Sequence, residues 1–421
     1  MRGKKLSIGL RATLVALGVV LFVTGTAASQ EVVLHSFHAR DGANPYGGLI
    51  FDGSGNLYGT TVVGGAYGYG AVFELTPAAG GRWTEKVLYD FSDNSSDGNH
   101  PQAGLVFDAA GNLYGTTGYG GSGACSNGTA VGCGTVFELS PQLGGDWKEK
   151  LLHSFDNNGT DGNYPVASLI FDADGNIYGT TQYGGAYDDG TAFELTPTGG
   201  SWTETVLHTF SPNGGDGEIP YAGLVFDAAG NLYGTTVYGG AYLFGTVFEL
   251  TPAVGGTWTE TVLHDFNNNG SDGTDPEASL ILDSYGNLYG TTVTGGGPYS
   301  GGTVFQLIPT VGGTWKERLL HSFGNGRDGI YPTASLMFDA SGNLYGTTFG
   351  GGAYYNGTVF ELSPILGVGW VEKPLHAFVG SARDGVGPFA SVVFDASGNL
   401  CGTTTSGGGA YDVGTVFEIT P

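Results

Sequence analysis

The chain has 421 residues, 80 of them glycine, and its 39 acidic side chains against 14 lysines and arginines give a net charge of −25 at neutral pH. A surface this negative repels nucleic acids and anionic membranes, so the composition excludes proteins that bind either of them through charge. Glycine-rich chains are often of low complexity. Here, however, the glycines recur at fixed places beside aromatic residues, which indicates a turn-rich β fold.

The first 29 residues are predicted to be a secretory signal peptide. Four basic residues precede residue 12, an apolar stretch continues to about residue 28, and small residues suited to cleavage follow. The apolar stretch is too short and wrongly flanked for a membrane span. We therefore expect the rest of the chain to be exported, secreted or periplasmic, with ten basic side chains against 39 acidic ones.

Seven copies of one repeat fill residues 30–421. The motif Gly-Asn-Leu-Tyr-Gly-Thr-Thr recurs with Ile177 for Leu in one copy and Cys401 for Tyr in the last. Its copies begin at Gly55, Gly111, Gly175, Gly230, Gly286, Gly342 and Gly398. The spacings are 55 or 56 residues except for one of 64 after the second copy. This predicts a single domain of repeats of about 56 residues, without room for a separate catalytic domain.

Each repeat contains four short β-type runs separated by glycine-rich turns. In the copy around Gly230 these runs are residues 222–226, 232–236, 246–251 and 258–266. Short strands with such turns, repeated many times, are typical of propeller blades. We predict an all-β, seven-bladed β-propeller with four antiparallel strands per blade.

The two ends of the chain predict how the ring closes. Residues 31–37 match only a fourth strand, and residues 414–421 match a third strand. The N-terminal strand can therefore complete the last blade, which removes the exposed edges of an open stack. Six tryptophans begin the internal fourth strands: Trp83, Trp147, Trp202, Trp258, Trp315 and Trp370.

Alternation along the fourth strand predicts which side chains face a neighbouring blade. With a period of two, one face carries Trp202, Glu204, Val206, His208 and Phe210. No single blade buries its own faces, so stability is expected to come from stacking between adjacent repeats.

Histidines occupy one position of the repeat. They are His35, His153, His208, His264, His321 and His376, with Tyr89 in the remaining copy. A catalytic or metal site needs a unique cluster, whereas these residues are distributed round the ring, so a structural role in hydrogen bonding is favoured. His38 and His100 fall outside this pattern, and the sequence identifies no partner for either.

The loop Asp-Gly-x-x-Pro joins the fourth strand of one repeat to the first of the next. Its aspartates are Asp41, Asp97, Asp161, Asp216, Asp272, Asp328 and Asp384. Residues 267–272 faintly resemble a calcium loop but lack its fixed set of oxygen ligands. An Asp-Gly turn is the favoured interpretation and calcium the alternative; no other metal or cofactor is expected.

Tyrosines recur in a second loop, Gly-Gly-Ala-Tyr, which lies on the same face because the strands alternate in direction. They are Tyr67, Tyr187, Tyr242, Tyr299, Tyr354 and Tyr411. Aromatic rings beside carboxylates suit recognition of carbohydrate or peptide. These tyrosines and the loop aspartates form the candidate ligand-binding rim; the alternative is that the tyrosines only cover the loops.

The insertion in the second repeat spans residues 122–133 and contains Cys125 and Cys133. In an exported chain, two cysteines this close predict a local disulfide. Cys401 replaces a strand tyrosine and is predicted to be a buried free thiol. The candidate polar residues recur from repeat to repeat, and the sequence shows no distinct nucleophile–base pair among them. No catalytic residue is therefore predicted.

The repeat unit continues after the first motif with Gly-Gly, then Gly-Thr-Val-Phe-Glu-Leu-Thr/Ser-Pro, then Trp. Over residues 31–421 it resembles the GloVer tandem repeat of exported bacterial proteins. This resemblance implies a propeller-like fold and carries no functional residue. A weaker likeness to kelch blades, in the order Gly-Gly at 239–240, Val-Phe at 247–248 and Trp258, supports the fold only.

These patterns favour an exported, monomeric, non-catalytic module that binds a protein or glycan, without a membrane span and without nucleic acid. Two alternatives stay open. One is a secreted carbohydrate-active enzyme with its site at the mouth of the central channel. The other is a structural component of the envelope or matrix.

Overall fold

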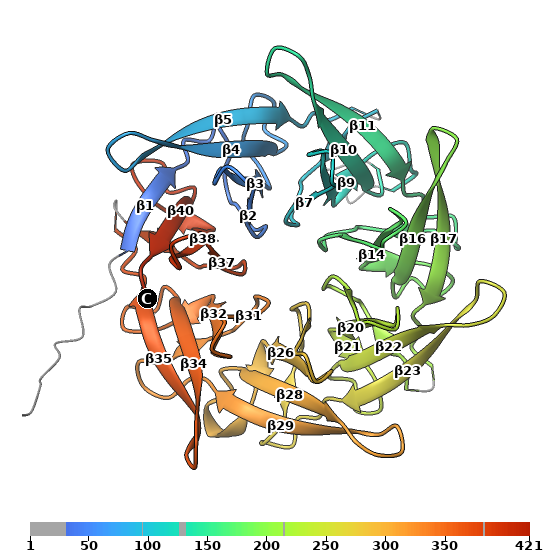
Figure 1. Cartoon of the computed structure of the whole chain (residues 1–421). Coiled ribbons are helices and arrows are strands. Elements are labelled where there is room, and N and C mark those ends of the chain that lie inside the picture. Colours follow the sequence, from blue (N-terminus) through green and yellow to red (C-terminus); the bar gives the residue numbers. More distant parts are fainter. Residues whose placement is uncertain (1–30, 95, 126–131, 214, 382–383) are drawn as a thin grey trace, which may run out of the picture.

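Seven four-stranded antiparallel sheets surround a central channel in the computed structural model (Figure 1). The structure describes residues 31–94, 96–125, 132–213, 215–381 and 384–421. The predicted signal peptide, residues 1–29, lies outside them. Among the described residues, no helix has the length and apolar character needed to cross a membrane.

The strands of each blade run from the channel outward in chain order, and blade 7 takes its outermost strand from the N-terminus. Blades 1 to 3 are β2 (Ile50–Phe51), β3 (Leu57–Thr61), β4 (Ala71–Ala78) and β5 (Arg82–Asp90); β7 (Val106–Phe107), β8 (Leu113–Thr117), β10 (Thr135–Pro141) and β11 (Trp147–Ser154); and β13 (Ile170–Phe171), β14 (Ile177–Thr181), β16 (Thr191–Thr198) and β17 (Ser201–Thr209). Blades 4 and 5 are β19 (Val225–Phe226), β20 (Leu232–Thr236), β22 (Thr246–Pro252) and β23 (Trp258–Asp265); and β25 (Ile281–Leu282), β26 (Leu288–Thr292), β28 (Thr303–Pro309) and β29 (Trp315–Ser322). Blades 6 and 7 are β31 (Met337–Phe338), β32 (Leu344–Thr348), β34 (Thr358–Ile365) and β35 (Gly369–Ala377); and β37 (Val393–Phe394), β38 (Leu400–Thr404), β40 (Thr415–Ile419) and β1 (Glu31–Ser36).

Small two-stranded sheets join the two kinds of loop on one face of the ring. In each, the Asp-Gly-x-x-Pro loop pairs with the loop that follows the second strand of the next blade. They are β6 (Gly98–Asn99) with β9 (Tyr119–Gly120), β12 (Gly162–Asn163) with β15 (Tyr183–Gly184), β18 (Gly217–Glu218) with β21 (Tyr238–Gly239), β24 (Gly273–Thr274) with β27 (Thr294–Gly295), β30 (Gly329–Ile330) with β33 (Gly350–Gly351), and β36 (Gly385–Val386) with β39 (Ser406–Gly407). A 3₁₀ turn, η1 (Gly297–Tyr299), lies in the blade 5 loop. We call this face the loop rim.

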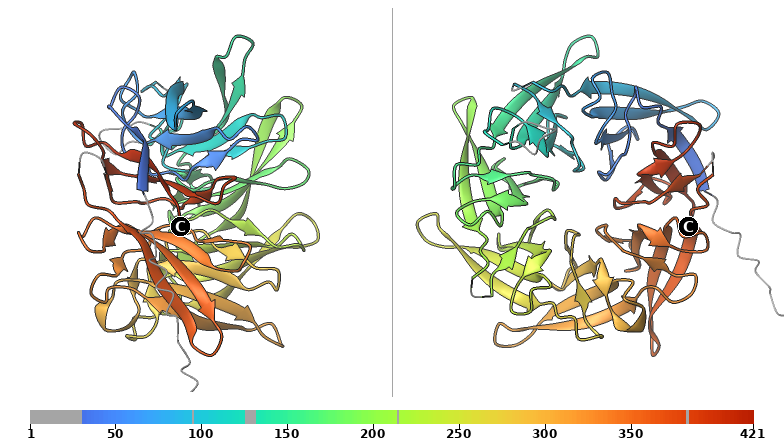
Figure 2. Two further views of the ribbon diagram at one scale, coloured as in Figure 1. Left: turned by 60° about the vertical axis from the view of Figure 1, so that its left-hand side comes forward. Right: turned by 180° about the vertical axis from the view of Figure 1, so that it is seen from behind.

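The N-terminal strand closes the ring, as the repeat phase predicted. β1 pairs antiparallel with β40, with Val33 opposite Phe417, and the sheet order is β1-β40-β38-β37. The two strands lie side by side in Figure 1 and in both views of Figure 2. The side chain of Phe37, just after β1, is fully buried. The edge that β40 would otherwise expose is therefore covered.

The first half of the repeated motif, with the aspartate before it, forms the turn between the first and second strands of each blade. This turn lies on the face opposite the loop rim. In blade 3, Asp172 Oδ1 accepts the N–H groups of Asp174 and Asn176, both at 2.9 Å. Its Oδ2 accepts the Asn176 side chain at 2.7 Å and the Tyr178 hydroxyl at 3.1 Å. These bonds stabilise the carboxylate and keep the pKa of Asp172 below its ordinary value despite partial burial. The recurring Asp, Asn and Tyr therefore form one hydrogen-bonded turn.

The second half of the motif holds neighbouring blades together. The Thr180 hydroxyl donates to the carbonyl of Ala222 in the next blade at 2.8 Å. Thr181 and Thr191 share a buried hydrogen bond at 2.8 Å inside the blade. Gly179 is required because a Cβ there would lie 2.7 Å from Cζ of Phe193.

Replacing Gly179 by alanine is expected to lower the free energy of unfolding by about 1–3 kcal/mol through overpacking against Phe193. Gly53→Ala is the matched control, because an added Cβ there has no atom within 4 Å. It should change stability by less than about 0.5 kcal/mol. Chemical denaturation of both variants measures the difference. Equal stability of the two variants would contradict the packing described.

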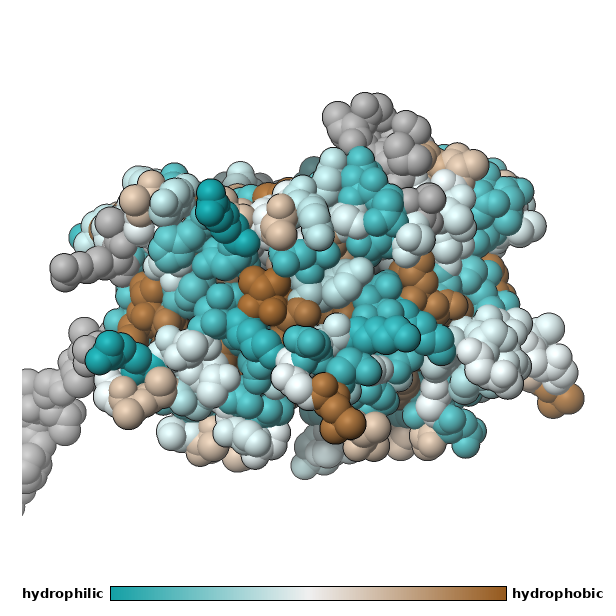
Figure 3. All heavy atoms as spheres, turned by 90° about the horizontal axis from the view of Figure 1, so that it is seen from above, coloured by the Kyte–Doolittle hydropathy of each residue, from teal (hydrophilic) through white to brown (hydrophobic). Residues whose placement is uncertain are grey.

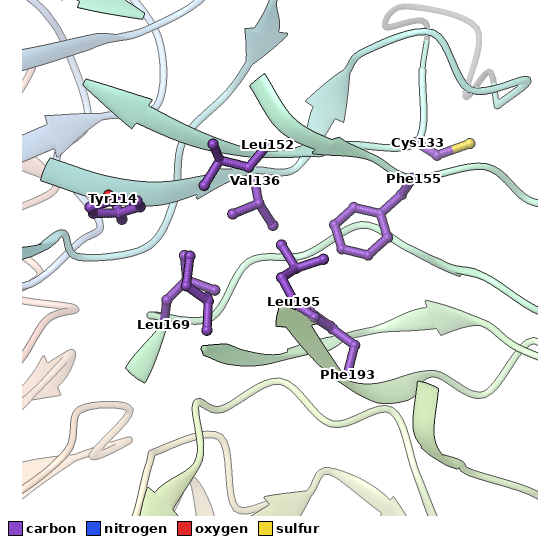
Figure 4. Close-up of a cluster of buried hydrophobic side chains, with 9 residues drawn as sticks. Tyr114, Cys133, Val136, Leu152, Phe155, Leu169, Phe193 and Leu195 are labelled. Atoms are coloured by element: carbon purple, nitrogen blue, oxygen red, sulfur yellow. The ribbon is translucent and has the colours of Figure 1, made fainter. Parts of the chain in front are cut away.

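The apolar cores lie between blades. One cluster joins Tyr114, Val136 and Phe155 of blade 2 to Phe193 and Leu195 of blade 3 (Figure 4). Equivalent clusters fill the other seams, including the one between β1 and blade 1. Burial of this apolar area is the main force that joins adjacent repeats.

A β-bulge corrects the predicted alternation along the fourth strand. In β17, Val206 lies opposite Phe193 and His208 opposite Ala192, so Leu207 is an extra residue. The same irregularity occurs in all seven outer strands. Because a bulge reverses the side of every later residue, Trp202 packs against blade 2 whereas Phe210 packs against blade 4. The prediction that these two rings share one face was wrong.

The side of the ring that Figure 3 shows carries no extended apolar patch. Hydrophobic residues there form small separate groups among hydrophilic ones. Protein-binding surfaces on soluble proteins are usually larger continuous patches.

Candidate functional site

The loop aspartates lie in the seams between blades. Asp161 is 7% exposed and accepts the N–H of Asp156 at 2.9 Å, which fixes its own loop. It also lies 3.3 Å from Nε2 of His153 on the preceding strand. Six seams have such a pair: His35–Asp41, His153–Asp161, His208–Asp216, His264–Asp272, His321–Asp328 and His376–Asp384. In the seventh, Asp97 faces Tyr89.

A glutamate from the next blade completes each seam, and sequence reasoning missed it. These residues are Glu31, Glu85, Glu149, Glu204, Glu260, Glu317 and Glu372. In each, Oε1 is buried and has no hydrogen-bond partner among the described residues. Burial, with repulsion from the neighbouring aspartate, raises the pKa of every one of them to about 7. The pattern Trp-x-Glu, which occurs at the same position in six repeats, is the sequence signal that could have identified these glutamates.

The seam groups can share a proton or offer ligand atoms to a cation. Four groups place one ligand atom of each residue within 4.8 Å of the others: His35–His38–Asp41, Glu31–His376–Asp384, His153–Asp161–Glu204 and His264–Asp272–Glu317. Calcium takes six to eight oxygens, so these mixed sets of three fit it poorly. At residues 267–272, Asn269 Oδ1 instead accepts the N–H groups of Ser271 and Asp272. Repetition round the ring favours a structural role for these groups, in which the histidine–aspartate pairs connect elements within the seams.

The tyrosines of the Gly-Gly-Ala-Tyr loops stand on the loop rim. Their exposed fractions lie between 55% and 63%: Tyr67, Tyr187, Tyr242, Tyr299, Tyr354 and Tyr411. The aspartate carboxylates point instead into the seams. Tyr411 and Asp41 are linked through His38: its ring centroid lies 5.4 Å from that of Tyr411, and its backbone N–H donates to the Asp41 carboxylate at 2.7 Å. His38 therefore has a partner that the sequence did not reveal.

One position of the loop rim combines a constant backbone with varied side chains. The residue before the loop proline has φ between 54° and 65° in all seven copies: Asn44, His100, Tyr164, Ile219, Asp275, Tyr331 and Gly387. This left-handed conformation is costly for non-glycine residues, and such strain gathers at functional sites. The residue after the proline also varies and lines the channel: Tyr46, Gln102, Val166, Tyr221, Glu277, Thr333 and Phe389.

Aromatic rings form a continuous row over blades 1 to 3 of the loop rim. Neighbouring ring centroids are 6.0, 5.6, 4.8 and 6.1 Å apart. The row, here called the aromatic arc, consists of Tyr69, His100, Tyr119, Tyr164 and Tyr183. It was not predicted, because its members come from different loops and occupy different repeat positions.

A pocket of about 540 Å³ opens beside the aromatic arc. Its wall includes the three arc tyrosines of blades 2 and 3, together with Asn157, Asn163 and Asp188. Cys125 and Cys133, which form a disulfide, also line the pocket. Residues 126–131 of the insertion lie outside the described chain. Cys401 is a buried free cysteine in the cluster of the closing seam and is not among the described residues that line this pocket.

The central channel is narrow, with a cavity of about 100 Å³. Tyr46 and Phe389 stack across one seam at 5.1 Å. Glu277 is the one carboxylate among the described channel-lining residues, and burial raises its pKa to about 7. Glycosidases generally use a pair of carboxyl groups. The described lining therefore gives little support to hydrolysis at the channel mouth.

Comparison with known families identifies the repeat. The model of the Gloeobacter/Verrucomicrobia repeat matches residues 16–124, 122–337 and 293–421. The chain belongs to the Gloeobacter/Verrucomicrobia repeat family. A comparison of this repeat protein with curated proteins found no match.

Solved structures similar to this repeat protein are distant in sequence. The extracellular domain of a hybrid two-component system of B. thetaiotaomicron is 9% identical, with a TM-score of 0.54 over 92% of this chain and 39% of that one. A candidate 6-phosphogluconolactonase of Bacteroides uniformis is 15% identical, with a TM-score of 0.50 over 84% and 88%. PorZ of Porphyromonas gingivalis, a surface component of the type-IX secretion system, is 16% identical, with a TM-score of 0.43 over 85% of this chain and 45% of that one. At these identities the likeness concerns the fold alone.

Proposed function

We propose that this repeat protein is an exported, monomeric, non-catalytic module that binds its ligand on the loop rim. The observation that carries the proposal is the combination of a constant framework with varied side chains at one rim. The backbone before each loop proline keeps one conformation while its side chain ranges from glycine to tyrosine. Variation on a rigid scaffold is the usual arrangement of binding surfaces.

The charged groups support binding over catalysis. Histidine–aspartate pairs recur in six of the seven described seams, and such regular repetition is typical of a structural role. The acidic surface disfavours anionic ligands and favours neutral or basic ones. A glycan or a protein segment of that kind fits the exposed tyrosines.

Screening residues 31–421 against glycan and peptide arrays, with product release followed in parallel, tests the proposal. We expect saturable binding without turnover. Tyr331→Ala on the loop rim should weaken binding, since this side chain is 40% exposed at the varied position. Tyr285→Ala is the matched control, because Tyr285 is 85% exposed but lies in a turn of the opposite face.

Absence of any saturable ligand would contradict the proposal and favour a structural component. Turnover abolished by a point substitution on the loop rim would contradict its non-catalytic part. Loss of binding in the Tyr285 variant alone would show that the ligand binds the face opposite the loop rim, which contradicts the proposed site.

A further inference from the structure

The pocket beside the disulfide lies where the repeat departs from its own pattern. Tyr119, Tyr183 and Tyr238 occupy equivalent positions in blades 2 to 4, and of these only Tyr119 and Tyr183 line the pocket. The other blades have Val63, Thr294, Gly350 and Ser406 there. Ala124, Cys125, Gly132 and Cys133, the described residues of the insertion that line the pocket, belong to a segment that the other repeats lack in sequence. A feature confined to one sector is not required for ring closure and is therefore available for a specific ligand.

The rings that line the pocket leave aromatic faces free. Tyr119 and Tyr164 are inclined at 54°, and Tyr164 and Tyr183 at 36°. Inclined rings at these separations do not cover one another completely. Tyr183 remains 39% exposed. An aromatic face with hydroxyl groups at its edge suits the apolar face of a sugar ring.

The polar lining suits hydroxyl groups and disfavours carboxylates. Asn157 and Asn163 supply amide donors and acceptors, and Asp188 supplies an acceptor that also holds the N–H of Gly184 at 3.0 Å. The described lining contains no lysine or arginine. A uronate would meet Asp188 without a compensating cation, whereas a neutral sugar would meet only hydrogen-bonding groups.

The central ring of the pocket is held before any ligand arrives. The N–H of Tyr164 donates to the carbonyl of Cys133 at 2.8 Å, and the Gln102 amide donates to the Tyr164 hydroxyl at 2.8 Å. The residue also keeps its left-handed φ of 59°. A preorganised side chain loses little freedom on binding, which favours affinity.

We infer that this pocket binds a neutral hexopyranose unit of a polysaccharide, with Tyr183 as the exposed stacking platform and Asn163 and Asp188 as hydrogen-bonding groups. The inference rests on the proposed function and names its ligand class. The volume of about 540 Å³ lies within the range of small-molecule sites.

Calorimetric titration with cello-, chito- and xylo-oligosaccharides and with oligogalacturonate tests the inference. At least one neutral series should bind, and oligogalacturonate should bind at least about tenfold more weakly. Tyr183→Ala should lower the affinity about tenfold or more, as expected when the aromatic ring on which the sugar stacks is removed. Tyr183→Phe should retain it within about threefold, since the ring face remains.

Tyr238→Ala is the matched control, because Tyr238 has the equivalent position in blade 4, is 48% exposed and lies outside the pocket lining. It should bind within about twofold of wild type. Unchanged binding by Tyr183→Ala, or preference for oligogalacturonate, overturns the inference. If binding survives in Tyr183→Ala but is lost in Tyr331→Ala, the ligand binds elsewhere on the loop rim. The assignment of the pocket is then overturned, whereas the proposed function is retained. If the wild-type chain binds only protein, the glycan assignment alone fails.

Discussion

Removal of residues 31–37 is expected to abolish the cooperative unfolding of the intact ring. These residues supply the outermost strand of blade 7, and without them β40 presents an unpaired edge. Phe37 alone is fully buried, and loss of such a side chain costs about 3–5 kcal/mol. The deletion also removes the β1 ladder, so the total loss should exceed that range. Near-ultraviolet circular dichroism during urea unfolding measures it.

A point substitution separates closure from any general effect of truncation. Phe37 contacts Phe73 across the closing seam at 5.1 Å, and Phe155 contacts Phe193 across an internal seam at 5.2 Å. Both Phe37 and Phe155 are fully buried. Phe37→Ala and Phe155→Ala should therefore destabilise the protein by similar amounts, each about 3–5 kcal/mol. A loss below about 1 kcal/mol for Phe37→Ala, with the full loss for Phe155→Ala, would show that the closing strand is dispensable.

The stability of the ring is expected to fall as the pH rises from about 5 to 8. The seven seam glutamates have their pKa raised from 4.5 to about 7 by burial. The folded chain therefore binds more protons than the unfolded chain between these values, and each proton lost on raising the pH destabilises the fold. After allowance for partial exposure, the free energy of unfolding is expected to fall by roughly 1 kcal/mol for each glutamate. Thermal unfolding measured at fixed ionic strength across this range tests the direction.

A single seam can be examined with Glu204→Gln, since glutamine imitates the protonated acid. Glu204 faces Asp161 and His153 across the seam. The variant should be more stable than wild type at pH 8, by roughly 1 kcal/mol, and equal to it near pH 5. Asp146→Asn is the control: it removes one negative charge at an exposed hairpin tip and should leave the pH profile unchanged. A wild-type profile that rises toward pH 8 would contradict the assignment.

The sequence predicted the architecture because the information for it is periodic and local. The recurring turn motif indicated the number of blades. The match of residues 31–37 to a fourth strand and of residues 414–421 to a third strand showed how blade 7 is completed. The predicted alternation of the outer strands failed at Leu207, because the bulge there turns the residues before and after it toward two different neighbouring blades. Nothing in the local pattern of apolar and polar residues distinguishes a bulged strand from a regular one.

The candidate site was harder to predict because its parts come from different repeats. Glu204 belongs to blade 3 but completes a group with His153 and Asp161 after blade 2, a proximity visible only once the blades are stacked. The pocket likewise joins Tyr119 and Tyr183 from neighbouring blades. The regular repeat drew attention to positions shared by every copy, whereas the pocket depends on positions at which the copies differ.

The location of bound ligand on the ring is the most direct test of the central claim. Hydrogen–deuterium exchange with and without a saturating glycan from the screen measures it for the whole chain. The account predicts slower exchange on the loop rim at residues 98–100, 119–121, 162–164, 183–185 and 329–331. Protection confined to the opposite face, at the turns of residues 52–56, 108–112 and 172–176, would contradict it.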